Sequence, residues 1–160
     1  MEFNGEYLYN KKWNGKGYDK NGNVVYELIN GNGKIKEYHL YSDKLLFEGE
    51  YLNGKRSGKG KIYSYNGNIL FEGEYLNGKR NGKGKEYDIN VNGKIVFEGE
   101  FLNDKRNGIG KEYDNNGHIT FFGEYLNGNK WKGKIKEFDE NNNLIFEGEY
   151  LNGERKGISN

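Results

Sequence analysis

One sequence unit of roughly 24 residues recurs along this 160-residue chain, and the repetition constrains the fold more than any other feature. Each copy opens on an aromatic residue, and most copies have Gly two positions later and a Gly-x-Gly element after a polar loop. The copies begin near Phe3, Tyr26, Phe47, Phe71, Phe97, Phe121 and Phe146. We predict one repeat array over 1–160, in which the copy at Tyr26 has a shortened loop and the last copy is truncated.

The composition favours strands and turns over helices. The chain has no Ala, Gln, Pro or Cys, while it has 26 Gly and 25 Asn, which are poor helix formers. A mean hydropathy this low is compatible with disorder. However, aromatic residues make up 16% of the chain and hold a regular spacing, which favours an ordered protein with a thin core.

Each copy is predicted to form a β-hairpin. In the copy at Phe47, we expect strands at 47–52 and 58–65, joined by Asn53-Gly54, a sequence typical of a two-residue type I′ turn. A second turn, at Asn66-Gly67, leads into the next copy. The predicted fold class is therefore all-β, an elongated single-layer antiparallel meander of about thirteen strands without a helix longer than one turn.

Pairing across these turns predicts a register. The first turn would place Gly49 opposite Gly58 and Phe47 opposite Gly60, and the second would place Gly58 opposite Tyr75. In this register one side of the sheet, the aromatic face, carries Phe, Tyr and Gly, with rings lying over glycines of the neighbouring strand. The other side, the charged face, carries Glu48, Glu50, Lys59, Lys61, Glu72 and Glu74.

The copy at Phe71, FEGEYLNGKRNGKGKEYD, resembles the MORN repeat (membrane occupation and recognition nexus). The matching positions are Phe71, Gly73, Tyr75, Asn77, Gly78, Gly82 and Gly84. The resemblance implies a twisted ribbon of hairpins that acts in scaffolding, in homodimerisation or in association with membranes or other proteins. The chain departs from the pattern at Leu28, Ile35 and Ile135, and Ile109 and Phe122 place apolar groups, as diagonal neighbours, on the charged face.

No residue constellation indicates catalysis. His39 and His118 lack partners in the sequence, and we interpret both as surface residues. The recurring Glu-x-Glu pairs, such as Glu48 and Glu50, could form a carboxylate dyad or a cation site, but a predicted Lys neighbour favours ion pairs that set the register. The Gly-x-Gly elements lack the third Gly and the helix of a nucleotide-binding loop. We predict no enzyme activity, no cofactor and no metal.

The primary functional prediction is a scaffold that binds an unidentified protein partner through the aromatic face, and that self-associates as a homodimer or end to end. A net charge of +1 argues against nucleic acid as a partner. The candidate partner-binding residues are Phe47, Tyr51, Phe71, Tyr75, Phe97, Phe101, Phe121, Tyr125, Phe146 and Tyr150.

The alternative prediction is peripheral binding to anionic phospholipids, such as phosphoinositides, through a basic edge of hairpin loops. Solvated loops and local packing of the two Trp residues are the simpler interpretations of the same residues. No segment resembles a signal peptide or a membrane span, so we expect a cytoplasmic location with membrane or cytoskeletal association. The candidate lipid-edge residues are Lys55, Arg56, Lys79, Arg80, Lys105, Arg106, Trp13 and Trp131.

Overall fold

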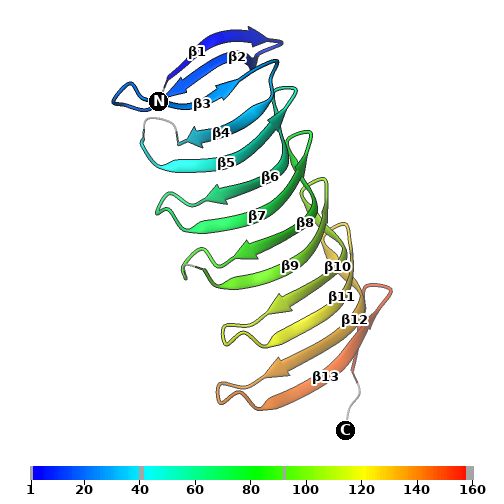
Figure 1. Ribbon diagram of the computed structural model, residues 1–160. Coiled ribbons are helices and arrows are strands. Elements are labelled where there is room, and N and C mark those ends of the chain that lie inside the picture. Colours follow the sequence, from blue (N-terminus) through cyan, green and yellow to red (C-terminus); the bar gives the residue numbers. More distant parts are fainter. Residues whose placement is uncertain (1, 40–41, 92, 158–160) are drawn as a thin grey trace.

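The computed structural model describes residues 2–39, 42–91 and 93–157, and over these ranges it contains fourteen strands and no helix (Figure 1). The predicted all-β meander is confirmed, with each strand antiparallel to the next. The strands are β1 (Glu2–Leu8), β2 (Lys11–Tyr18), β3 (Val24–Leu28), β4 (Gly33–Tyr38), β5 (Leu45–Leu52), β6 (Lys55–Tyr63), β7 (Ile69–Leu76), β8 (Lys79–Tyr87), β9 (Ile95–Leu102), β10 (Lys105–Tyr113), β11 (Ile119–Leu126), β12 (Asn129–Phe138), β13 (Leu144–Leu151) and β14 (Glu154–Gly157).

The ribbon consists of two sheets in series. Strands β1 to β3 form the first, and β4 to β14 form an eleven-stranded second. Between them, β3 and β4 are joined by one isolated bridge, Ile29 to Asn32, around a turn at Asn30-Gly31. This is the copy at Tyr26, for which the sequence predicted a shortened loop. The sheet is interrupted at that loop.

The predicted hairpin turns form with the expected backbone. Asn53 and Gly54 have φ of 53° and 71°, and Asn77 and Gly78 have 53° and 90°, as a type I′ turn requires. Successive turns also bind one another, because Gly78 N–H donates to the carbonyl of Arg56 at 2.8 Å. The turns therefore line up along one side of the ribbon, which we call the hairpin edge and which comprises the turns beginning at Asn53, Asn77, Asn103, Asn127 and Asn152.

The predicted register between copies is correct, and the predicted register within a hairpin is wrong by two residues. Tyr75 lies opposite Gly58 as expected, but Gly49 pairs with Gly60 and Phe47 pairs with Ile62. The cause is a bulge, in which residues 57–59 lie opposite the single residue Glu50. Because the shift is even, the two faces keep their predicted residues.

The bulge explains the first glycine of the Gly-x-Gly elements in the copies at Phe71 and Phe97. Gly82 and Gly108 have φ of 100° and 96°, a region that side chains disfavour. A glutamate of the preceding strand caps each bulge: Glu74 Oε2 accepts from Lys83 N–H at 2.9 Å, and Glu100 Oε2 accepts from Ile109 N–H at 3.0 Å.

The aromatic face forms the core of the molecule. The Phe97 ring is fully buried and lies over Gly99 and Gly110, where an added Cβ would come within 2.7 Å of it. The centroids of Phe97 and Phe101 lie 5.4 Å apart, although four residues of a flat strand span about 13 Å. The Phe97 ring therefore leans along its own strand, over Gly99 and toward Phe101, and a single layer of curved strands (Figure 1) encloses its own core.

Candidate functional site

The aromatic face is closed to partners. Exposed fractions of 0 to 4% characterise Phe47, Phe71, Tyr75, Phe97, Phe101, Phe121 and Tyr125, and only Tyr51, Phe146 and Tyr150 are partly accessible. The structure thus contradicts the expectation that these rings line an open binding surface. The physical reason is that the rings lie flat over glycines and against one another, and that cationic side chains lie over them.

Each of those cations is the second residue of the strand that follows a hairpin turn. The Arg106 guanidinium lies 4.1 Å from the Phe97 ring centroid and forms ion pairs of 2.7 Å with both Glu86 and Glu112. Related contacts join Arg56 to Phe47 and Glu37, Arg80 to Phe71 and Glu86, Lys130 to Phe121 and Glu112, and Arg155 to Phe146 and Glu137. The two-residue turn causes this placement, because it pairs Leu52 with Lys55 and therefore Tyr51 with Arg56, which then share a face.

The partly buried ion pair of Arg56 and Glu37 is charged near neutral pH. Burial alone would raise the pKa of Glu37, but hydrogen bonds from Arg56 and from the Tyr51 hydroxyl outweigh it and hold that pKa below its usual value. Arg56, Arg80 and Arg106 therefore pack against the aromatic core. Three of the six basic residues predicted for a lipid-binding edge are thus engaged within the fold.

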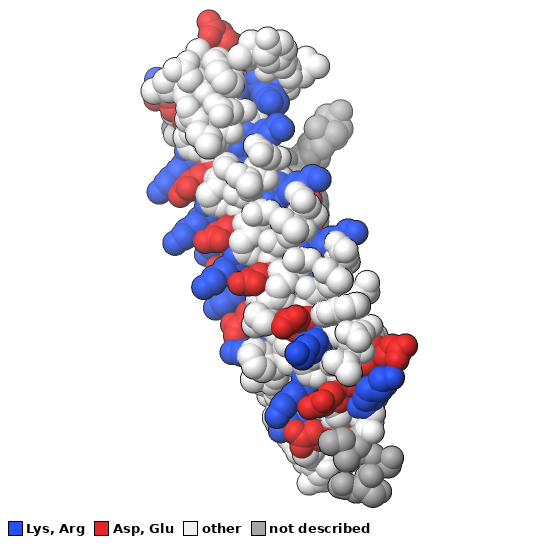
Figure 2. Space-filling view, turned by 90° about the vertical axis from the view of Figure 1, so that its right-hand side faces the viewer, with Lys and Arg blue, Asp and Glu red and all other residues white. Residues whose placement is uncertain are grey.

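The hairpin edge keeps Lys55, Lys79 and Lys105, whose side chains are exposed. Each pairs with a leucine that was not among the predicted lipid-edge residues, such as Leu76 opposite Lys79. Figure 2 shows the side of the molecule that carries these turns, with a long uncharged band flanked by charged side chains. The exposed leucines of this edge are Leu52, Leu76, Leu102, Leu126 and Leu151, at 44 to 53% exposure. A leucine directly precedes each of these turns in the sequence, so the sequence pattern alone could have identified this row of leucines.

The two Trp residues pack locally. The backbone carbonyl of Trp13 accepts a hydrogen bond from Gly31 N–H at 2.8 Å, and that of Trp131 accepts one from Gly153 N–H at 2.9 Å. Each indole lies against the turn of the following copy, at the same glycines. Trp131 retains an exposed fraction of 37%, so only part of its ring is accessible at the hairpin edge.

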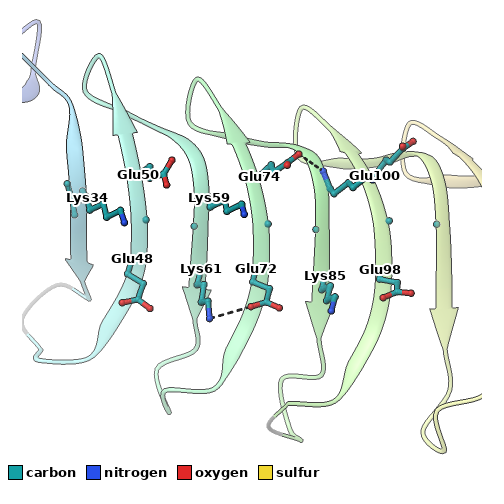
Figure 3. A pocket seen from close by; sticks show the side chains of 18 of the residues that line it. Lys34, Glu48, Glu50, Lys59, Lys61, Glu72, Glu74, Lys85, Glu98 and Glu100 are labelled. Atoms are coloured by element: carbon teal, nitrogen blue, oxygen red, sulfur yellow. Dashed lines mark hydrogen bonds and ion pairs between the residues drawn. The ribbon is translucent and has the colours of Figure 1, made fainter.

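The open surface is the charged face, which holds a groove of about 1000 Å³ (Figure 3). Paired glycines such as Gly73 and Gly84 form its floor, and two rows of ionic side chains form its walls. The turn-proximal row runs Lys34, Glu50, Lys59, Glu74, Lys83, Glu100, and the turn-distal row runs Lys36, Glu48, Lys61, Glu72, Lys85, Glu98. Lys and Glu alternate from strand to strand in both rows.

Tyrosine hydroxyls donate hydrogen bonds to glutamates of the turn-distal row. The Tyr87 hydroxyl donates to Glu72 at 2.6 Å, and the Lys61 ammonium lies 3.4 Å from the same carboxylate. The bond from Tyr87 lowers the pKa of Glu72, while burial and Glu72 raise the pKa of Tyr87 to about 12. In the pairs Glu72/Glu74 and Glu98/Glu100, the first Glu thus binds Tyr and Lys and the second caps the bulge, so both have structural partners.

The sequence model of the MORN repeat matches the chain at residues 47–69, 71–90 and 97–119. The protein carries MORN repeats. The matched segments coincide with the hairpins β5–β6, β7–β8 and β9–β10. No curated protein was found to match the chain. MORN repeats commonly serve as protein- or membrane-interaction modules, and the family is generally not enzymatic. No part of the described chain forms a helix long and apolar enough to cross a bilayer.

Two side chains break the pattern of this MORN array at one end of the groove. Ile109 of β10 stands in the turn-proximal row where a Lys is expected, and Phe122 of β11 stands in the turn-distal row where a Glu is expected. Ile109 lies opposite Glu124 and Phe122 lies opposite Lys111, so the two are diagonal neighbours as predicted. Their exposed fractions are 47% and 48%, so neither is covered.

Proposed function

We propose that this MORN array is a scaffold that binds a protein partner along its charged face. The observation that carries the proposal is the groove itself, which crosses the eight strands β4 to β11 of the second sheet while the aromatic face is closed. Seven Lys and six Glu line it, so its walls are nearly balanced in charge. Such a surface suits a polypeptide with charges of both signs better than a polyanion.

The dimensions of the groove support an elongated occupant. Eight strands at about 4.8 Å spacing give a length of roughly 34 Å, and charges of one sign recur about every 9.6 Å along each wall. The floor is glycine backbone, which lets a partner approach the sheet closely. We therefore place the scaffold function on the charged face and not on the aromatic residues that the sequence favoured.

Affinity capture with the full chain tests this placement. The bait variant Lys59→Glu/Lys83→Glu reverses two charges of the turn-proximal row, and Lys79→Glu/Lys105→Glu makes the same change at exposed positions of the hairpin edge. We expect partners quantified by mass spectrometry to be lost from the first bait and kept by the second. Equal retention by both baits would contradict a binding role for the groove.

A second candidate function, binding to anionic membranes, is favoured by the hairpin edge. Exposed leucines beside Lys55, Lys79 and Lys105 combine apolar area with positive charge. A Lys held near an anionic surface is worth about 1 kcal/mol, so several loops acting together would give useful affinity. Ribbon twist limits how many loops meet a flat bilayer at once.

Co-sedimentation with liposomes, with and without phosphoinositides, tests this candidate. We expect Leu76→Ser/Leu102→Ser/Lys79→Gln/Lys105→Gln to lose binding and Lys59→Gln/Lys83→Gln, on the charged face, to keep it. Arginines are left intact because they hold the core. Absence of binding to anionic vesicles at low salt would remove the candidate.

A further inference from the structure

The turn-proximal wall of the groove presents cations that the fold leaves unpaired. Lys34, Lys59 and Lys83 are exposed, and no ion pair of the described chain includes them. The turn-distal wall differs, because Lys61 pairs with Glu72 and a tyrosine hydroxyl binds the same carboxylate. The three unpaired ammonium groups lie on β4, β6 and β8. They recur about every 9.6 Å along the groove, so a partner would place anionic groups at that interval.

The interval identifies the conformation of a partner segment that crosses the strands. A polyproline II helix advances about 3.1 Å per residue with three residues per turn, so each of its sides recurs about every 9.3 Å. One side of an α-helix recurs about every 5.4 Å, which falls out of step with strands about 4.8 Å apart. Side chains on one face of a β-strand recur about every 6.7 Å, which matches neither interval. Of the three, only polyproline II stays in register with the lysines.

A polyproline II segment in the groove presents two of its three side-chain rows to the walls. Figure 3 looks onto the charged face, with Lys34 on the left and the hairpin turns at the top. A left-handed helix that crosses this view from left to right turns successive side chains to the turn-proximal wall, the turn-distal wall and solvent. An acidic residue over Lys59 is then followed, about 3.1 Å further on, by a residue nearest to Glu72 of the next strand. The complementary sequence is therefore acidic, basic and any third residue, repeated.

Ile109 and Phe122 end this charge pattern. Ile109 lies on the turn-proximal wall where β4, β6 and β8 carry Lys, and Phe122 lies on the turn-distal wall where β5, β7 and β9 carry Glu. Both are exposed, at 47% and 48%. If an acidic residue lies over Lys83, the third and fourth residues after it advance by about 9.3 and 12.4 Å and come nearest to Ile109 and Phe122. Two adjacent apolar residues at those places would cover the pair.

We infer that the partner of the charged face is a polypeptide segment in the polyproline II conformation, with an acidic and a basic residue in each triplet and two adjacent apolar residues at one end. The charges alone are satisfied after any shift of two strands, and each exposed ion pair contributes little to affinity. Ile109 and Phe122 occur once, so burying them selects one register. This inference rests on the proposed function, because it names the class of partner that occupies the same groove.

Fluorescence anisotropy with dye-labelled synthetic peptides, at low salt and with the full chain, tests the inference. The probe is three Glu-Lys-Pro repeats followed by Leu-Leu-Pro. Its control is three Lys-Glu-Pro repeats followed by Leu-Leu-Pro, which has the same composition and net charge. The control can align either its charges or its leucines with the groove, but not both at once. We expect the probe to bind roughly fivefold more tightly or better. Equal affinity of the two peptides overturns the inference.

The variant Ile109→Lys/Phe122→Glu tests the role of the apolar pair. It has the residues that the other copies carry at these positions, so it should fold. We expect it to bind the two peptides equally, because neither can then cover an apolar pair. Leu102→Lys/Leu126→Glu removes two similarly exposed apolar side chains from the hairpin edge and should keep the preference for the probe. A preference that survives in Ile109→Lys/Phe122→Glu overturns the assigned register.

Replacing every proline of the probe by glycine tests the conformation. Proline holds itself and the residue before it near polyproline II, whereas glycine must lose more freedom on binding. We expect the glycine peptide to bind roughly threefold more weakly or worse, and an unchanged affinity would contradict the polyproline II assignment. Affinity capture judges the proposed function separately. A chain that binds neither peptide, but whose Lys59→Glu/Lys83→Glu bait still loses captured partners, would refute this class of partner and leave the proposed function intact.

Discussion

The second glycine of each Gly-x-Gly element makes room for a ring. At Gly84, an added Cβ would lie 2.5 Å from the Phe71 ring, whose neighbours Tyr75 and Phe101 leave it no space to move. We expect Gly84→Ala to lower the free energy of unfolding by about 1–3 kcal/mol, measured by urea denaturation. Lys83→Ala, at an exposed position of the same strand, is the control. Equal stability of the two variants would contradict the packing described here.

The tyrosines of the charged face make a prediction for alkaline pH. The folded chain raises the pKa of Tyr87 and of Tyr113 to about 12, from an ordinary value near 10. The unfolded chain therefore loses these protons first, so stability holds below about pH 10 and declines between about pH 10 and 12. Tyr87→Phe/Tyr113→Phe should flatten that decline in urea unfolding measured against pH. An unchanged slope, compared with Tyr65→Phe at an exposed site, would count against the Tyr–Glu bonds.

At the scale of the hairpin, Arg106 couples neighbouring copies. It joins Glu86 of β8 to Glu112 of its own strand and lies over Phe97. Arg106→Met would leave two half-buried carboxylates without this partner, and we expect a loss of about 1–3 kcal/mol in the free energy of unfolding. The adjacent exposed Lys105→Met should have little effect on the same thermal and urea unfolding curves. A difference within error between the two would mean that the ion pairs do not stabilise the packing of copies.

The hairpin also shows where sequence reasoning succeeds and where it stops. The turns, the two faces and the pairing between copies follow from Asn-Gly dipeptides and strict alternation, and all were predicted. The bulge opposite Glu50 was missed because a shift of two residues leaves the alternation unchanged. Only the need for a positive φ at Gly58 distinguishes the two registers, and glycine alone does not reveal its own conformation.

At the scale of the whole molecule, the faces exchange the roles that the sequence suggested. Aromatic residues on one side of a single sheet predict an exposed surface only if their rings stand clear of the sheet. Here each ring leans over glycines into contact with the ring four residues away, and the arginine that follows each turn lies over the rings. The Lys and Glu pattern predicted a solvated face, which is present, but the glycine-floored groove between its rows required the three-dimensional register.

Hydroxyl-radical footprinting of the full chain tests this reversal most directly. Side chains on a closed aromatic face should be oxidised slowly, and exposed aromatic and aliphatic residues of the charged face should be oxidised fast. We predict strong protection of Phe97, Phe101 and Phe121 and rapid modification of Phe122, which lies next to Phe121 in the sequence but on the opposite face. Rapid modification of Phe97 and Phe101, at rates like that of Phe122, would contradict a closed aromatic core and return the binding surface to that face.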